Sequence, residues 1–183
     1  MSSDDYLKSL LVPCPDFPKK GVVFLDMSPI LSNPLAFETL ISNLSHHLTA
    51  YTIHKSPKKK IDAVVGLDSR GFIFGPILAL RLGAAFVMVR KKGKLPGRCV
   101  EASFEKEYGS DTFEMQSDII LPGHNVIVID DLIATGGSAQ AAGELVRQQG
   151  GTVLEYVFPF ELTFLSGAAK LDAPVYSVVK IDS

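Results

Sequence analysis

Cysteine is scarce in this sequence: among 183 residues, only Cys14 and Cys99 carry a thiol. Secreted domains that depend on disulfides are cysteine-rich, so the chain does not belong to that class. The N-terminal residues also lack the basic cluster and the long apolar run that a secretory signal peptide needs. These absences predict an intracellular protein, and we expect it in the cytoplasm.

The sequence also has no excess of basic charge. Its 18 Lys and Arg face 20 Asp and Glu, for a net charge of −2, whereas nucleic-acid-binding proteins are commonly basic. We therefore expect no nucleic-acid partner. The most apolar stretch, 71–89, has the length of a membrane span but contains Arg81, Pro76 and Gly83. We interpret it as a buried helix followed by a buried strand, and expect no membrane contact.

What is present predicts a globular α/β protein. Hydrophobic residues make up 46% of the chain, and its length is that of one domain over 1–183. Continuous apolar runs are typical of strands that are buried on both faces. Such runs occur at 61–66, 85–90, 126–130, 153–158 and 175–179. Helical stretches at 72–82 and 138–149 alternate with them. We therefore predict an open, mainly parallel, twisted sheet with helices on both faces.

Two segments lie outside this alternation. Residues 1–33 combine a short helix that ends before Pro13 with a stretch rich in proline and glycine, and we expect a small lobe there. Asn33 followed by Pro34 predicts the start of the next helix, because asparagine caps helices and proline fits their first turn. Between 92 and 115 the periodicity fails, which predicts a long irregular functional loop.

The strongest functional signal follows the strand at 126–130. Asp130 and Asp131 end that strand, and a turn of small and hydroxylated residues leads into a helix: Ala134, Thr135, Gly136, Gly137 and Ser138. Free backbone N–H groups, hydroxyls and a helix N-terminus together predict a cradle for a phosphate monoester. No lysine follows the glycines, so this is not a Walker A loop, nor does it match the dinucleotide fingerprint. Two acids would repel the phosphate, so we expect them to bind sugar hydroxyls or metal-bound water.

This segment resembles the phosphoribosyl-pyrophosphate signature of type I phosphoribosyltransferases. Four more segments resemble the adenine branch of that family, in the same order: 17–24, 66–76, 90–97 and 107–109. The resemblance covers nearly the whole chain. It implies the type I phosphoribosyltransferase fold, with 1–33 contributing to a hood and 92–115 forming a flexible catalytic loop. It also implies transfer of a phosphoribosyl group from phosphoribosyl pyrophosphate to adenine, giving AMP and pyrophosphate.

The resemblance assigns most of the donor site. It implies that Asp130, Asp131 and the cradle residues 134–138 bind the ribose and 5-phosphate of the donor. Mg²⁺ would be held mainly by the donor and by water near the two acids. The resemblance implies that pyrophosphate binds to the turn Asp68, Ser69 and Arg70 and to Lys91 and Lys94. The Asp68–Ser69 peptide of that turn is commonly cis in the family. Arg90 is expected to reach the site of a partner subunit, which implies a homodimer.

The resemblance also assigns the adenine side. It places the base against Val23, Phe24 and Leu25, with the Phe24 ring as stacking face. Glu107 would be the catalytic acid or base, and Tyr108 would share its lid. Many members carry arginine at the position of Leu25, so base contacts there are expected to come mainly from the backbone. Ser138 replaces the commoner threonine and keeps the hydroxyl.

The residues alone leave alternatives open. Each motif has an ordinary structural interpretation: a helix cap at 134–138, a surface Arg70, a solvated basic loop at 90–94, a solvated Glu107 and a packed Phe24. At the level of function, the alternatives are transfer to another base (guanine, xanthine or orotate), a nucleic-acid-binding regulator on this fold, and an inactive paralogue. His46, His47 and His54 lack acidic or cysteine partners at metal-site spacing.

Overall fold

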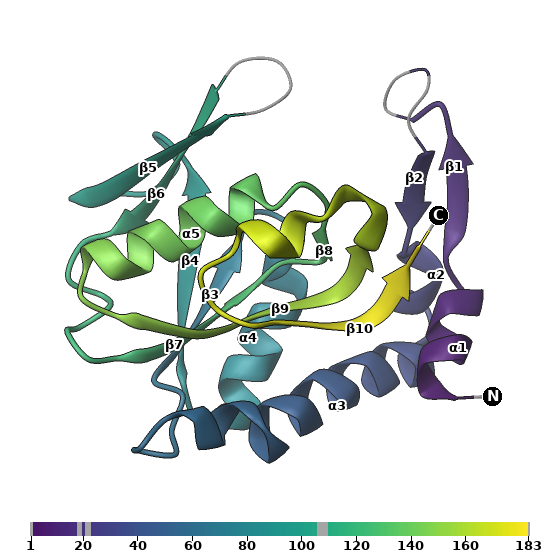
Figure 1. The fold of residues 1–183 in the computed structure, drawn as a ribbon, viewed down its shortest axis with the longest axis horizontal. Helices are drawn as coiled ribbons and strands as arrows, with labels where there is room; N and C mark the ends of the chain where they lie inside the picture. The colour runs from purple at the N-terminus through teal and green to yellow at the C-terminus, as the bar shows by residue number, and fades with distance from the viewer. Residues whose placement is uncertain (1, 18–19, 21–22, 106–109, 183) are drawn as a thin grey trace.

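The sheet at the centre of the molecule is open and mainly parallel, as predicted (Figure 1). The computed structural model describes residues 2–17, 20, 23–105 and 110–182. Parallel neighbours run in the order β10-β9-β7-β3-β4, and the short β8 (Leu132–Ile133) pairs with β9. These strands are β3 (Ala63–Leu67), β4 (Ala85–Lys91), β7 (Asn125–Ile129), β9 (Thr152–Leu162) and β10 (Val175–Ile181). All five predicted strands are confirmed, with bounds that differ by a few residues.

Helices cover both faces of this sheet, as predicted. On one face, α3 (Pro34–Ala50) and α4 (Gly71–Leu82) pack with Val64 and Ile127 in one hydrophobic cluster. On the other face, α5 (Gly137–Gln148) packs with Val65 and Val128 in a second cluster. Neighbouring residues of a strand point to opposite faces, so Val64 and Val65 supply different layers. Burial on both sides explains the continuous apolar runs.

Local sequence signals fix the helix ends. The Asn33 side-chain oxygen accepts hydrogen bonds from the backbone N–H groups of Leu35 and Ala36, at 3.0 and 3.2 Å, which confirms the predicted cap of α3. Gly83 ends α4 in the left-handed conformation, with φ of 61°, where glycine has no steric penalty. Within the described residues, no helix has the length and apolar character that a membrane span requires.

The N-terminal lobe, called the hood below, has its own small sheet. It contains α1 (Ser3–Ser9), β1 (Val12–Pro15), β2 (Val23–Asp26) and α2 (Ser28–Leu31), and its two strands pair antiparallel. Leu7 and Ile30 anchor the hood, because both are fully buried in the cluster that contains α3 and α4. The hood is therefore built on the same core as the main sheet.

The expectation of irregular backbone over 92–115 is wrong. β5 (Cys99–Glu105) and β6 (Ser110–Gln116) form an antiparallel pair, and β6 extends the main sheet by pairing with β4. Val100, Ala102 and Phe104 alternate with exposed Glu101 and Ser103, a period-two pattern that the sequence analysis overlooked. Figure 1 shows this hairpin and the hood on opposite sides of the molecule. The flexibility of the segment stays a prediction.

Candidate active site

The predicted donor-binding residues meet at one edge of the sheet. β3, β7 and β4 run parallel, so their carboxyl ends lie together, at the edge where ligands bind in open α/β sheets. The turn 68–70 follows β3, the acids Asp130 and Asp131 follow β7, and the cations of 90–94 begin at the end of β4. Three segments far apart in sequence therefore supply one site.

Arg70 links these segments. Its Nε lies 2.9 Å from Oδ2 of Asp131, and its guanidinium carbon lies 5.2 Å from the centroid of the Phe24 ring. The peptide bond between Asp68 and Ser69 is cis, as the family resemblance predicted. Arg70 is 42% exposed, so its charge remains open to solvent and to a ligand. The turn 68–70 thus contacts both the hood and the paired acids.

The paired acids are partly withdrawn from water. Asp131 is 6% exposed, and the Asp130 carboxylate accepts a hydrogen bond from the Asp131 backbone N–H at 2.9 Å. Burial raises the pKa of Asp130, and the neighbouring Asp131 charge raises it further. Burial also raises the pKa of Asp131, while Arg70 opposes that rise. Buried carboxylates gain most from donors that replace their lost water, so hydroxyls and hydrated cations suit this pair.

The cradle is a small cavity at the N-terminus of α5. Its volume is about 110 Å³, and Asp130 lines it together with all five cradle residues, 134–138. Gly136 occupies the cap position with φ of 82°, and no side chain of the described residues caps this helix. The first-turn N–H groups of α5 are therefore available to an anion, as the sequence predicted.

A glycine outside every predicted motif packs against the backbone of the cradle. A Cβ on Gly136 would lie 2.5 Å from the carbonyl oxygen of Gly167, and a Cβ on Gly167 would overlap the carbonyl oxygen of Ala134. Gly167 begins the short helix η3 (Gly167–Lys170). Sequence reasoning missed it because a lone glycine carries no motif, and only the fold shows that backbone approaches backbone here.

The basic segment lies beside the turn 68–70. Arg90 Nε lies 2.7 Å from Oδ2 of Asp68, and Arg90 Nη1 donates to the backbone carbonyl of Lys94 at 3.1 Å. Lys91 forms an ion pair with Asp111 at 3.2 Å, and Lys94 is exposed. In this single chain, Arg90 contacts its own turn 68–70, and its role in a partner's site stays a prediction.

The adenine-side predictions fall on the hood and on the hairpin. Phe24 packs edge-on against Phe17, with ring centroids 5.2 Å apart, and presents its ring to Arg70. Leu25 packs against the hydrophobic core. Because successive side chains of a strand point to opposite sides, the neighbouring Phe24 ring points away from that core. Val23 contributes its backbone to β2, paired with Pro15. Glu107 and Tyr108 lie outside the described residues, between the ends of β5 and β6.

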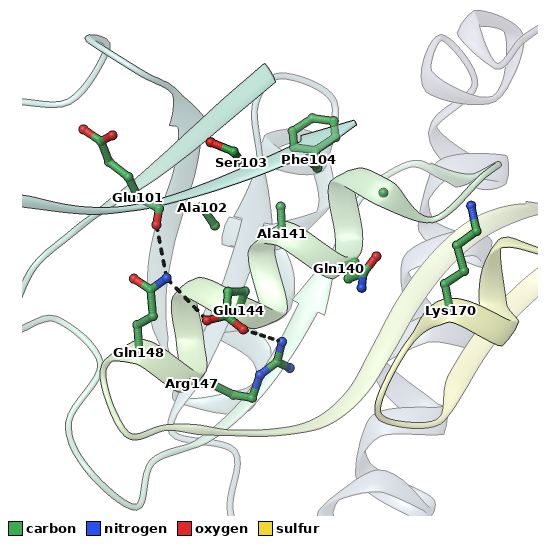
Figure 2. A pocket seen from close by; sticks show the side chains of 11 residues that line it. Glu101, Ala102, Ser103, Phe104, Gln140, Ala141, Glu144, Arg147, Gln148 and Lys170 are labelled. Atoms are coloured by element: carbon green, nitrogen blue, oxygen red, sulfur yellow. Dashed lines mark hydrogen bonds and ion pairs between the residues drawn. The ribbon is translucent and has the colours of Figure 1, made fainter. Parts of the chain in front are cut away.

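A larger cavity lies between β5 and α5 and differs from the predicted site (Figure 2). It measures about 600 Å³ and shares only Gly137 with the cradle lining. Its wall is polar: Gln148 donates to the Glu101 carbonyl at 3.1 Å, and Arg147 pairs with Glu144 at 3.0 Å. The hydrogen bond from Gln148 tethers β5 to α5, whereas the Arg147–Glu144 pair lies within α5.

Comparisons with known proteins agree with this geometry. Residues 42–183 match the model of the phosphoribosyl transferase domain family. Adenine phosphoribosyltransferase from Yarrowia lipolytica is 54% identical over 173 residues, covering 94% of this chain and 93% of that protein. Adenine phosphoribosyltransferase 1 from Saccharomyces cerevisiae is also 54% identical, covering 94% and 90%.

Solved structures extend the comparison to ligand complexes. The Saccharomyces cerevisiae enzyme complexed with D-2,5-dideoxy-2,5-imino-altritol 1,6-bisphosphate and adenine matches with a TM-score of 0.90 at 53% identity, covering 96% of this chain and 98% of that one. The Trypanosoma brucei enzyme in complex with AMP, pyrophosphate and ribose-5-phosphate matches with a TM-score of 0.85 at 26% identity, covering 98% and 80%. The chain therefore belongs to the adenine phosphoribosyltransferase family.

Proposed function

We propose that this protein is an enzyme that transfers the 5-phosphoribosyl group of phosphoribosyl pyrophosphate to adenine, giving AMP and pyrophosphate. The convergence of the cradle, the paired acids and Arg70 at one sheet edge carries this proposal. A relative with 54% identity is named for this activity. We place the enzyme in purine salvage, and we keep the cytoplasm as its proposed compartment.

Each part of the donor has a matching chemistry in the site. The 5-phosphate binds the cradle, where backbone N–H groups and the hydroxyls of Thr135 and Ser138 can donate hydrogen bonds. Asp130 and Asp131 accept hydrogen bonds from the ribose hydroxyls. Pyrophosphate binds beside Asp68, Ser69 and Arg70, with the cations Lys91 and Lys94 as further partners.

The residues present fit a magnesium ion held mainly by the substrate. Asp130 and Asp131 offer the oxygen donors that Mg²⁺ prefers, usually one or two carboxylates beside substrate phosphates. Among the described residues, no group of three or more His, Cys, Asp or Glu could enclose a metal. Asp130 and Asp131 would therefore hold the ion through water, and it would offset the charge on the departing pyrophosphate.

The chain's own residues would then manage the base. A ring nitrogen of adenine displaces pyrophosphate at the anomeric carbon, and such centres pass through oxocarbenium-like transition states. Phe24 would stack on the purine, and the backbone at Val23 and Leu25 would select its edge. Glu107 would accept the proton that the purine loses, while the lid carrying Glu107 and Tyr108 excludes water.

We further propose a homodimer built on α4 and β4. Leu80 of α4 is 85% exposed and Met88 of β4 is 38% exposed, with half-buried Phe72 and Phe86 nearby in sequence. Exposed apolar surface of this kind commonly marks a protein interface. Arg90 lies two residues after Met88 in the same strand, so both side chains point to one face, which would carry Arg90 towards a partner's site.

A turnover assay with Mg²⁺, the sugar donor and each base in separate reactions tests the function. We expect adenine to be consumed far faster than guanine, xanthine or orotate, with AMP and pyrophosphate formed in equal amounts. Reactions without donor serve as controls. Faster turnover of another base would overturn the assignment of adenine, and folded protein with no turnover would support the inactive paralogue.

Subunit mixing tests the shared site. Arg90→Ala and Glu107→Gln proteins are each expected to be weakly active, and mixing them should restore part of the activity because one hybrid site is intact. Exchange of subunits is verified with differently tagged chains. If exchange is demonstrated and no activity returns, Arg90 does not serve a neighbouring site.

A further inference from the structure

A buried carboxylate outside the predicted site lies under the basic segment. Glu114 belongs to β6 and is only 5% exposed. One of its oxygens accepts hydrogen bonds from the backbone N–H groups of Lys94 and Leu95, at 2.8 and 2.6 Å. Gly93 precedes these residues with a φ of 81°, which bends the chain at this point. Two consecutive backbone N–H groups of the turn 93–95 therefore converge on one carboxylate oxygen.

The electrostatics of Glu114 suit a permanent acceptor. Burial alone would raise the pKa of Glu114, but its backbone hydrogen bonds outweigh that effect and hold the pKa below its ordinary value. Glu114 therefore stays ionised at neutral pH and accepts hydrogen bonds only. Its backbone neighbour in the register is Arg90, so the carboxylate sits level with the end of β4.

The turn 93–95 is in contact with the pyrophosphate side of the site. The Lys94 carbonyl accepts from Arg90 Nη1, and Arg90 Nε lies 2.7 Å from Asp68 in the turn 68–70. A continuous path thus runs from Glu114 through the turn 93–95 to Arg90 and Asp68. Because Lys94 leaves this turn as an exposed side chain, the position of the turn decides where its ammonium group can reach.

We propose that Glu114 is a positioning residue, which fixes the turn 93–95 so that Lys94 meets the pyrophosphate group of the donor. The inference rests on the proposed function, because it needs Lys94 to bind pyrophosphate. Glu114 itself touches no substrate. Glutamine at this position would keep the size and one acceptor oxygen but lose the negative charge, so its hydrogen bonds to the turn 93–95 would be weaker.

A double-mutant cycle tests this role. Glu114→Gln and Lys94→Ala should each raise the KM for the sugar donor by about tenfold, roughly the value of one charge-assisted hydrogen bond. Because both substitutions act through the ammonium group of Lys94, the donor KM of the double variant should lie within about twofold of the higher of the two single-variant KM values. In the reverse reaction, the KM for pyrophosphate should rise while that for AMP changes less than about twofold.

Glu101→Gln is the matched control. Glu101 lies directly opposite Glu114 in the β5–β6 register, but its carboxylate pairs with Lys92 at 2.8 Å. We expect Glu101→Gln to leave the KM for the sugar donor unchanged. If Glu114→Gln does not fold, Glu114→Asp takes its place in the cycle; it keeps the charge, with a shorter reach to the turn, and should give an intermediate KM.

The outcomes separate the two proposals. If Lys94→Ala leaves the donor KM unchanged, Lys94 does not bind pyrophosphate, and the role of Glu114 falls with that assignment. If Lys94→Ala raises the KM but Glu114→Gln does not, only the positioning role is overturned. Fully additive effects in the double variant, or an equal rise in the KM for AMP, would likewise leave Glu114 as a structural residue.

Discussion

Replacing Glu155 should cost stability without affecting catalysis. Glu155 lies on β9 and is 2% exposed. Its carboxylate accepts hydrogen bonds from the Thr52 hydroxyl, from Lys55 Nζ at 2.7 Å and from the His47 ring at 3.0 Å. These partners lie on α3 and η1 (Thr52–Lys55), so one side chain joins that helical layer to the sheet. None of the four belongs to the proposed site.

The magnitude follows from burial. Removing one partner of a buried charged pair typically costs about 3–5 kcal/mol, because the remaining groups lose their compensation. Thr52 is fully buried, so its hydroxyl would be left without an acceptor. Lys55 is 35% exposed and its ammonium group can be solvated after the substitution, so loss of the Lys55 pair contributes less to the decrease in the free energy of unfolding. We therefore expect Glu155→Ala to lower the free energy of unfolding by about 3 kcal/mol, and Glu155→Gln by roughly half of that.

The pH dependence gives a second readout. Burial would raise the pKa of Glu155, but the hydrogen bonds from His47, Lys55 and Thr52 outweigh it and lower the pKa from its ordinary value of 4.5. A lowered pKa in the folded state stabilises the protein above the unfolded-state value, and this stabilisation is lost as pH falls through the folded value. The stability gap between the parent protein and Glu155→Gln should therefore narrow below about pH 4.5.

Urea unfolding monitored by circular dichroism measures these differences, with kcat determined on the same samples. Glu38→Ala is the control, because Glu38 pairs with Arg81 on the surface and is 58% exposed. Such a pair is worth less than about 1 kcal/mol. The reasoning is refuted if Glu155→Ala costs no more than Glu38→Ala. It also fails if the stability gap is the same at pH 7 and below pH 4.5, or if kcat falls.

Three further predictions concern the site. Thr135→Ala should raise the donor KM about tenfold in steady-state assays while the urea midpoint moves little, because Thr135 is exposed; an unchanged KM would remove it from the phosphate site. Gly167→Ala should both weaken donor binding, measured by calorimetry, and lower the melting temperature, since its Cβ would displace the cradle; a normal donor affinity would show that η3 does not shape the cradle. Glu107→Gln should lower kcat by about 10²–10⁴-fold with donor binding nearly unchanged, and near-normal turnover in single-turnover experiments would leave Glu107 without a role in proton transfer.

The α/β core was predictable because its signals are local. Continuous apolar runs predict strands covered on both faces, and Asn33 before Pro34 marks the start of a helix. The β5–β6 hairpin was missed because Gly93, Pro96 and Gly97 dominate the segment before it. Charged residues then obscure the alternation of Val100, Ala102 and Phe104, which needs the neighbouring β4 to become a sheet.

The site was predictable where chemistry is encoded in neighbouring residues. Asp130, Asp131 and the cradle lie within one short segment of the sequence, and Asp130 lines the same cavity as residues 134–138. Gly167 and Glu114 were not predictable, because each acts on backbone that lies far from it in sequence. Likewise, the contact of Arg70 with Phe24 depends on how the hood lies against the sheet, which no local pattern specifies.

The meeting of the hood, the turn 68–70, the β7 acids and η3 has a consequence for folding equilibria. No single fragment of the chain contains the whole site, so the sugar donor can bind with full affinity only to the assembled native state. Binding then stabilises the contacts between segments that are far apart in the sequence. A ligand present at one hundred times its dissociation constant stabilises the native state by about 2.7 kcal/mol. Donor concentration in the cell would thereby set the resistance of the whole chain to unfolding and proteolysis.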